Sequence, residues 1–160
     1  MAETTIEKLK GVLIYSIKLE RSDPSSADDI ILFSTNCGFF KMYHNQDCSE
    51  QVQIEDISGE LIDIVGSEVL DAYSATEIKE GENNAGGSSS TWTFYNIATI
   101  RGSVNIRWLG ESNGYYSEKV NFKKITKEEY LEIFNGKEKT NLNASKKNVE
   151  IFCVSSCGVA

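Results

Sequence analysis

The chain is short of several residues on which common functional sites depend. It has one histidine, His44, and one proline, Pro24, among its 160 residues. A single histidine excludes the catalytic zinc sites that are built from two or three histidines. The low proline content, with 40% hydrophobic and 10% aromatic residues, argues against a disordered chain. We therefore expect an ordered domain without a histidine-rich metal centre.

Long hydrophobic runs are also missing. No stretch approaches the ~18 consecutive apolar residues of a membrane helix, and residues 1–10 are polar where a signal peptide would have an apolar core. We therefore expect a cytoplasmic protein that has no membrane partner. In a reducing cytoplasm its four cysteines are expected to be free thiols.

The cysteines do not have the spacing of a familiar zinc motif. Cys153 and Cys157 could meet Cys37, Cys48 or His44 at a zinc ion, but the two closely spaced Cys pairs of a zinc ribbon are missing. The Gly/Ser-rich stretch at 81–90 lacks the lysine and the ordered spacing of a phosphate-binding loop. No metal and no cofactor are therefore predicted.

Positive charge is the minority sign. There are 24 Asp and Glu residues against 16 Lys and Arg residues, which gives a formal net charge of −8. Nucleic-acid backbones attract basic surfaces through counterion release, so direct nucleic-acid binding is not expected. An acidic domain can bind a basic protein surface, although solubility alone also accounts for such a charge.

Most of the chain has the alternation of β-strands. Apolar and polar residues alternate between Val12 and Glu20, and Thr91–Arg101 is the segment richest in β-branched and aromatic residues. Further strands are expected at Ile30–Phe33, Phe39–His44, Gln51–Ile54, Val69–Glu80, Ser103–Leu109 and Tyr115–Lys123. The prediction is a mainly β (α+β) fold, an antiparallel sheet or a small, partly open barrel or sandwich with one or two short helices.

Asn113-Gly114 is the strongest turn signal in the chain. This dipeptide favours the two successive positive φ angles of a two-residue hairpin. The pattern therefore predicts that Ser103–Leu109 and Tyr115–Lys123 pair as neighbours. Together with Thr91–Arg101 they are expected to form a three-stranded meander.

Two short helices are predicted from their capping residues. Ser58 is expected to cap one or two helical turns that Gly66 closes. Thr126, with Glu129 three residues later, forms a capping box that begins a second helix, and Gly136 ends it.

The helix end at residue 136 divides the predicted organisation of the chain. Residues 1–136 are expected to form a single β-rich domain with a flexible Gly/Ser-rich loop at 81–90. Residues 137–160 are expected to form a polar linker and then either a tail or an added strand.

Two segments of unusual composition resemble an uncharacterised family. They are YHNQDCSEQVQIEDISGELIDIVGSEV at 43–69 and TWTFYNIATIRGSVNIRWLGESNGYYSEKVNF at 91–122. Through them the chain resembles a β-rich domain family associated with bacteriophages, prophages and some bacteria. The resemblance implies a small β-rich domain without catalytic residues that can be transferred. It also implies an accessory protein that acts on the host.

The predicted hairpin gathers residue types that are common at binding hot spots. Alternate residues of paired strands share a face, which places Arg107 opposite Tyr115 or Ser117 and near Glu118. The candidate binding residues are Arg107, Trp108, Glu111, Asn113, Tyr115, Tyr116 and Glu118. An arginine beside aromatic rings can hold a phosphate or a base-like ring. The alternative is a solvated face with an ion pair of Arg107, and with Trp108 in the core.

A secondary candidate site follows the strand that ends near His44. It consists of His44, Asp47, Cys48 and Glu50, and residues at a strand end commonly carry function. Within hydrogen-bond reach, His44 could activate Cys48 as a nucleophile. We favour the structural alternative, in which Asp47 satisfies loop backbone groups and Cys48 is a small buried residue.

The sequence thus predicts a non-enzymatic binding protein of phage or prophage origin. Its expected partner is a host protein that it modulates or inhibits, which includes a counter-defence role. A second hypothesis is a module that binds a small molecule or nucleotide in a pocket lined by Arg107 and aromatic residues. A third is a small hydrolase that uses His44 and Cys48.

Overall fold

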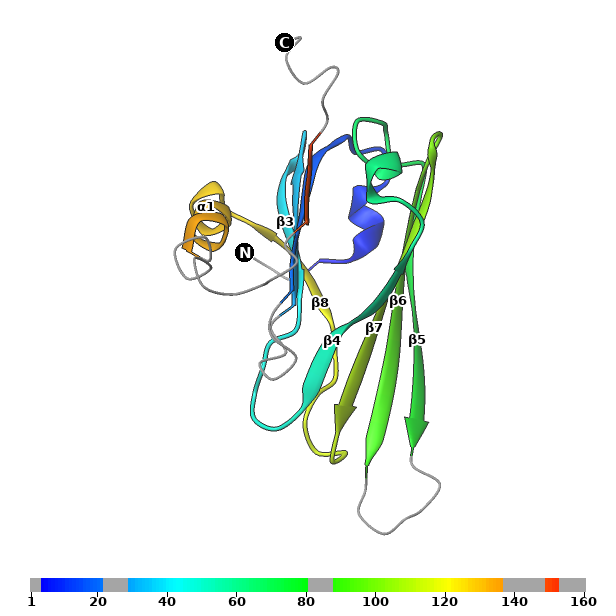
Figure 1. The fold of residues 1–160 in the computed structure, drawn as a ribbon, viewed down its shortest axis with the longest axis vertical. Helices are drawn as coiled ribbons and strands as arrows, with labels where there is room; N and C mark the ends of the chain where they lie inside the picture. The colour runs from blue at the N-terminus through cyan, green and yellow to red at the C-terminus, as the bar shows by residue number, and fades with distance from the viewer. Residues whose placement is uncertain (1–3, 22–28, 81–87, 137–148, 153–160) are drawn as a thin grey trace.

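The computed structural model contains two antiparallel sheets that face each other across one hydrophobic core (Figure 1). It describes residues 4–21, 29–80, 88–136 and 149–152. The strand order is β8-β3-β2-β1-β9 in the five-stranded sheet and β4-β7-β6-β5 in the four-stranded sheet. This arrangement confirms the predicted mainly β, α+β class, and among the predicted alternatives it is the sandwich.

The five-stranded sheet contains a hairpin made from two of the predicted strands, β2 and β3. Its strands are β1 (Ile14–Glu20), β2 (Ile30–Thr35), β3 (Gly38–Tyr43), β8 (Asn121–Ile125) and β9 (Val149–Phe152). β2 and β3 pair directly across the turn at Asn36-Cys37. A tail or an added strand was expected within residues 137–160. The structure has the added strand, β9, which pairs with β1.

The four-stranded sheet contains a meander of consecutive strands. Its strands are β4 (Gln51–Ser58), β5 (Asp71–Glu80), β6 (Ser89–Thr99) and β7 (Gly102–Ser112). Ser89 and Ser90 were expected in the flexible loop at 81–90, but they belong to β6 and pair with β5 and β7. Residues 81–87 of that loop lie outside the described residues.

The predicted hairpin at Asn113-Gly114 is wrong. A turn does form there: the hydroxyl of Ser112 accepts the Gly114 N–H at 3.0 Å, and Gly114 has a φ of 87°. The chain then crosses to the other sheet, where β8 pairs with β3 and not with β7. The physical reason is burial, because β8 places Phe122 in a stack on Phe40, with ring centroids 5.4 Å apart.

Short helices lie inside and outside the sandwich. The 3₁₀ helix η1 (Ile6–Leu9) lies between the sheets and the α-helix α1 (Lys127–Gly136) covers the outer face of the five-stranded sheet (Figure 1). The hydroxyl of Thr126 accepts the Glu129 N–H at 3.1 Å, which confirms the predicted N-cap.

The helix predicted after Ser58 differs from the expectation. Ser58 is the last residue of β4, and the helical turn there is the 3₁₀ helix η2 (Leu61–Ile64). Its N-cap residue is Glu60, which makes no capping hydrogen bond through its side chain. The reason is strand pairing: Ser58 pairs with Asn105 of β7 and therefore continues β4 instead of starting a helix.

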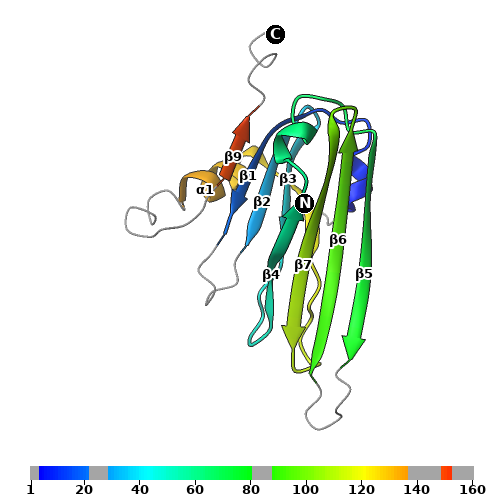
Figure 2. The same ribbon diagram turned by 45° about the vertical axis from the view of Figure 1, so that its right-hand side comes forward.

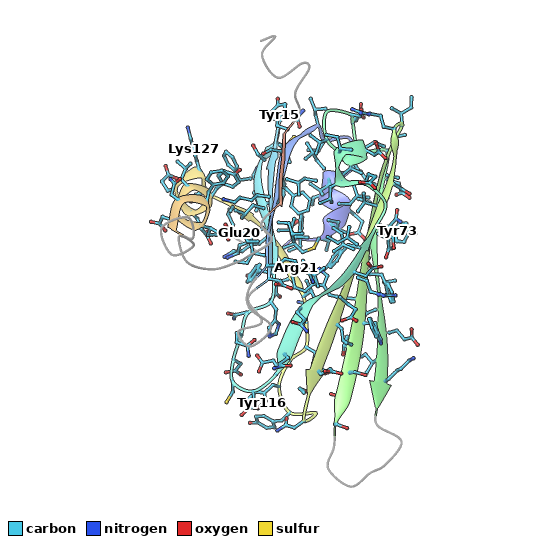
Figure 3. The ribbon with its side chains drawn as sticks, viewed as in Figure 1. Tyr15, Glu20, Arg21, Tyr73, Tyr116 and Lys127 are labelled. Atoms are coloured by element: carbon cyan, nitrogen blue, oxygen red, sulfur yellow. The ribbon has the colours of Figure 1, made fainter. Side chains whose placement is uncertain are left out.

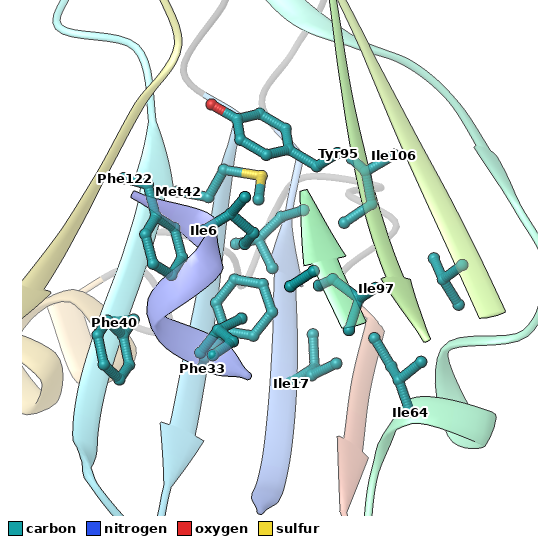
Figure 4. Packing of buried hydrophobic residues seen from close by; sticks show 14 of the residues in the cluster. Ile6, Ile17, Phe33, Phe40, Met42, Ile64, Tyr95, Ile97, Ile106 and Phe122 are labelled. Carbon is teal, nitrogen blue, oxygen red and sulfur yellow. The ribbon is translucent and has the colours of Figure 1, made fainter. Parts of the chain in front are cut away.

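The core lies where the inner faces of both sheets carry apolar residues (Figure 4). Trp108 of β7 and Phe33 of β2 are its largest fully buried side chains. The indole N–H of Trp108 points at the sulfur of Met42, 3.3 Å away on β3. The sheets therefore contact each other through side chains from strands that are distant in sequence.

Replacing Trp108 by Ala should lower the free energy of unfolding by about 3–5 kcal/mol, because the change leaves a large cavity in the core. The matched control is Arg107→Ala, one residue earlier on the outer face, which should cost less than about 1 kcal/mol. Urea unfolding followed by circular dichroism measures both values. Equal losses in the two variants would contradict the assigned faces of β7.

Candidate functional site

The loop between β3 and β4 is folded around the carboxylate of Glu50. The backbone N–H groups of Asp47 and Cys48 donate to Glu50 Oε1 at 2.5 Å and Oε2 at 3.0 Å. His44 Nε2 lies 3.0 Å from Oε1. The side chain of Glu50 is 0% exposed, so this carboxylate is an internal anchor of the loop.

His44 connects this loop to the segment that leads into β8. Its Nδ1 lies 2.7 Å from the backbone oxygen of Lys119, while its Nε2 faces Glu50. A carbonyl and a carboxylate are both hydrogen-bond acceptors, so each ring nitrogen of His44 faces a protein acceptor. The side chain of His44 is 3% exposed, which means that water does not substitute for either partner.

Hydrogen bonding determines the protonation of Glu50. Burial by itself raises the pKa of the carboxyl group, but the N–H groups of Asp47 and Cys48 and the ring of His44 hydrogen-bond the charged form. The net effect lowers the pKa of Glu50 from 4.5 to about 2. Glu50 is therefore a buried anion whose charge is matched by donors.

This geometry does not form a nucleophile and base. Both ring nitrogens of His44 are engaged by Glu50 and Lys119, which leaves no nitrogen for Cys48. Cys48 is an exposed free thiol, so the expectation that it is buried is wrong. It lies beside Tyr116, whose pKa is raised mainly by a hydrogen bond with Cys48 and, second, by the electrostatic interaction with that side chain.

The candidate binding residues on and after β7 do not form one surface. Arg107 lies on the outer face of the four-stranded sheet, 3.9 Å from Asp56 and with its guanidinium 5.2 Å from the ring centroid of Trp92. Trp108 points into the core, as the alternative reading of this cluster had it. The proposed Arg107 contacts across a hairpin are absent because β7 and β8 do not pair.

The other members of that cluster lie on the crossing between the sheets. Glu111 is exposed at the end of β7, and Asn113 accepts the Tyr115 N–H at 3.1 Å within the turn. Tyr115 is 84% exposed and meets Tyr116 edge to face, and Figure 3 places Tyr116 at the end of the molecule where the loops gather. These residues form an exposed tip.

Glu118 follows this tip and turns back between the sheets. Its Oε2 accepts hydrogen bonds from the hydroxyls of Ser89 at 2.8 Å and Thr91 at 3.4 Å. Its Oε1 is buried and has no hydrogen-bond partner among the described residues. An unsatisfied buried acceptor costs about 1–3 kcal/mol, so this oxygen is the most unusual polar atom of the crossing.

Three contacts fix the segment that carries Glu118. A Cβ atom added at Gly110 would lie 2.7 Å from the Glu118 Cβ, so the segment rests directly on β7. The hydroxyl of Tyr95 donates to the Val120 backbone oxygen at 3.3 Å, and His44 holds the oxygen of Lys119. The position of Glu118 is therefore determined by both sheets.

A cavity of about 430 Å³ lies beside this segment, and we call it the inter-sheet pocket. β5, β6 and β7 extend beyond the end of the five-stranded sheet (Figure 2), and β5 and β6 contribute lining residues to the pocket. Its described lining comprises Thr4, Thr5, Ile6, Ser74, Thr76, Ile78, Thr91, Thr93, Tyr95, Ser117, Glu118, Lys119, Val120 and Phe122. Sequence reasoning selected only Glu118 of these residues.

A signal for this pocket exists in the sequence of β5 and β6. Thr91 and Thr93 continue the inward-facing series that begins with Ile97 and Tyr95, and Thr76 pairs directly with Thr93. Hydroxyl residues therefore replace apolar ones on the inner face toward one end of the sheet. Such a change of polarity on a buried face marks an opening.

The part of the chain that the structure describes contains neither a metal cluster nor a membrane helix. No three of its His, Cys, Asp and Glu residues are arranged to hold an ion. Cys153 and Cys157, considered for zinc, lie outside the described residues. None of the helices in the described ranges is long and apolar enough to cross a membrane.

One family model matches the chain, and it covers residues 5–122. Since that is more than half of the sequence, the chain belongs to this family, DUF7448, which is described as a domain of unknown function. The match ends in β8, before α1 and β9. No curated protein and no solved structure matches the chain.

Glu50→Gln should lower the free energy of unfolding by about 2 kcal/mol at neutral pH, because a charged acceptor of three donors is lost. Since folding lowers the pKa of Glu50, the contribution of its charge is present above pH 4.5 and is lost as the pH falls toward about 2.

Urea unfolding as a function of pH measures this dependence. The difference between the wild type and Glu50→Gln should shrink through that acidic range, while Glu111→Gln, at an exposed position, should follow the wild type. A difference that stays constant down to the acidic limit would show that the Glu50 charge is not the source of the stabilisation.

Proposed function

We propose that this member of the DUF7448 family is a non-enzymatic binding protein whose ligand occupies the inter-sheet pocket. The observation that carries the proposal is Glu118, a carboxylate in the pocket lining with a buried oxygen that has no partner among the described residues. Such an acceptor is satisfied when a ligand brings a hydrogen-bond donor. The ligand would thus supply the hydrogen-bond donor that the described residues do not provide.

The size and lining of the pocket support a small ligand. Binding pockets for small molecules commonly measure about 300–1,000 Å³ and combine apolar walls with a few polar groups. Here the walls include Ile6, Ile78 and Phe122, while the polar groups are hydroxyls and Glu118. A compact molecule with donors at one end matches this division.

The engagement of His44 supports binding over catalysis. General base catalysis requires a basic nitrogen within hydrogen-bond reach of the proton that it removes. Both nitrogens of His44 already contact protein acceptors, and this residue is the only histidine of the chain.

A wider role is proposed from the sequence resemblance. Segments 43–69 and 91–122 resemble a phage- and prophage-associated family, which supports a binding protein that modulates a host factor in the host cytoplasm. The specific observation in favour of a protein partner is the exposed tip, where Tyr115 is exposed beside the half-buried Tyr116. Tyrosine is enriched at the energetic centres of protein interfaces.

A pocket-filling substitution tests the binding site. Thr76→Trp adds a large ring to a lining position, and we expect it to abolish the amide shift changes that a panel of cationic, neutral and anionic fragments causes in ¹H–¹⁵N NMR spectra of the full chain. The matched control is Glu77→Trp, because the next residue of β5 faces the opposite side.

The same spectra define the outcome against the proposal. Fragments of at least one class should shift amides of β5, β6 and residues 117–120 in the wild type and in Glu77→Trp. If no class shifts them, or if Thr76→Trp leaves the shifts unchanged, the pocket is not a ligand site. The dispersed amide signals of each variant report whether it is folded.

A further inference from the structure

We infer that the ligand of the inter-sheet pocket carries a positively charged amine, and that Glu118 binds this group. The inference rests on the proposed function, because it assigns the chemical class of the ligand in the same pocket. Beyond that function, the ligand has a positive charge, and Glu118 is the residue that binds it.

Glu118 is the only carboxylate in the described lining of the pocket. Its Oε2 receives the hydroxyls of Ser89 and Thr91, whereas Oε1 is left without a donor among the described residues. An ammonium group has three donors and no acceptor. It can therefore donate to the carboxylate of Glu118 without opposing any neighbouring donor.

The inferred charge of the ligand follows from its partner in the pocket, which is a carboxylate. A hydrogen bond between an ammonium and a carboxylate is about twice as strong as one between neutral groups. An alcohol can donate a hydrogen bond to the carboxylate of Glu118 but brings no positive charge to it. The pocket therefore favours an amine over a neutral donor of the same size.

Hydroxyls around the carboxylate extend the polar end of the pocket. Thr76 and Thr93 are directly opposed on β5 and β6, and Ser117 immediately precedes Glu118. A hydroxyl both donates and accepts hydrogen bonds, so these residues can accept hydrogen bonds from the remaining N–H groups of the amine. They can also bind hydroxyls of the ligand next to it.

The apolar part of the lining accommodates the body of the ligand. Ile6 comes from η1, Ile78 from β5 and Phe122 from β8, so three separate elements contribute apolar side chains. The ligand class is thus an amine with a compact body that is partly apolar.

The carboxylate is held in place before any ligand arrives. The backbone of Glu118 rests on Gly110, where an added Cβ would lie only 3.0 Å from the backbone oxygen of Glu118. His44 holds the next carbonyl, that of Lys119, and Tyr95 holds the carbonyl after it, that of Val120. A fixed charged group lowers the ordering cost of binding.

Lys119 is the positively charged residue in the described lining, and it defines the competing ligand class. An anion would use its ammonium group, whereas an amine uses Glu118. The two residues are neighbours in the chain, so the sign of the ligand charge decides which of them matters. Matched probes that differ only in their polar group separate these cases.

Three such probes are cyclohexylmethylamine, cyclohexylmethanol and cyclohexanecarboxylate, which share one apolar ring. ¹H–¹⁵N NMR titration of the full chain measures their dissociation constants from the amide shifts of β5, β6 and residues 117–120. We expect the amine to bind at least about tenfold more tightly than the alcohol, as one additional charge-assisted hydrogen bond provides. The carboxylate should bind most weakly.

Glu118→Gln keeps the shape of the side chain and removes its charge. We expect it to weaken the amine by about tenfold and to leave the alcohol nearly unchanged. Glu111→Gln, which removes an exposed carboxylate at the end of β7, is the matched control and should leave all three dissociation constants unchanged.

The inference and the proposed function fail in different ways. Equal binding of the amine and the alcohol, or stronger binding of the carboxylate, overturns the inference while the pocket remains a binding site. An amine affinity that Glu118→Gln leaves unchanged also overturns it. If Glu118→Gln does not fold, the three wild-type constants decide the matter alone. If none of the probes binds, the amine assignment is rejected, and the broader fragment panel decides the proposed function.

Discussion

The buried carboxylate of Glu50 determines the arrangement of the open end of the sandwich. Two loops meet there, one between β3 and β4 and one between β7 and β8, and neither has a strand ladder to fix it. The carboxylate binds its own loop through two backbone N–H groups and binds His44 at the same time. His44 then reaches the carbonyl of Lys119 in the second loop.

This connection explains how a charged group is tolerated inside the structure. A buried ion is stabilising only when its hydrogen-bonding capacity is filled and its charge is opposed. Glu50 has three donors around its two oxygens, and the pKa of its carboxyl is lowered to about 2 in spite of burial. Glu118, by contrast, keeps one buried oxygen without a donor among the described residues. The two carboxylates at this end thus differ in how fully they are hydrogen-bonded, and Glu118, the less fully hydrogen-bonded of the two, lines the pocket.

The alternation of apolar and polar residues predicted most of the fold, and it failed where local and distant signals disagreed. β3, β6 and β7 follow their patterns because each has one buried face, whereas in β1 the polar residues Ser16, Lys18 and Glu20 are buried as well. Asn113-Gly114 predicted a hairpin because it favours a turn, and the turn exists. A turn sets local angles but does not choose the next partner strand. Stacking of Phe122 on Phe40 does so, and no local pattern contains that contact.

The candidate site was predictable only in its parts. In the cluster from His44 to Glu50, Asp47 was expected to satisfy the loop backbone groups, but the acceptor for the loop N–H groups is Glu50 and not Asp47. Glu118 was selected for a surface with Arg107, whereas it lies between the sheets with Ser89 and Thr91. Its neighbours there come from strands whose register a single sequence does not state.

The polar end of the inner sheet face is therefore best understood as a departure from what stability alone favours. Apolar side chains at Thr91 and Thr93 would bury more hydrophobic surface against the segment at 117–120. Instead, the chain places hydroxyls and a carboxylate there and fixes them with Gly110, Tyr95 and His44. Departures of this kind in an otherwise consistent fold are expected at functional sites. A rigid support around an unsatisfied acceptor is therefore the feature of this fold that supports the proposed binding site.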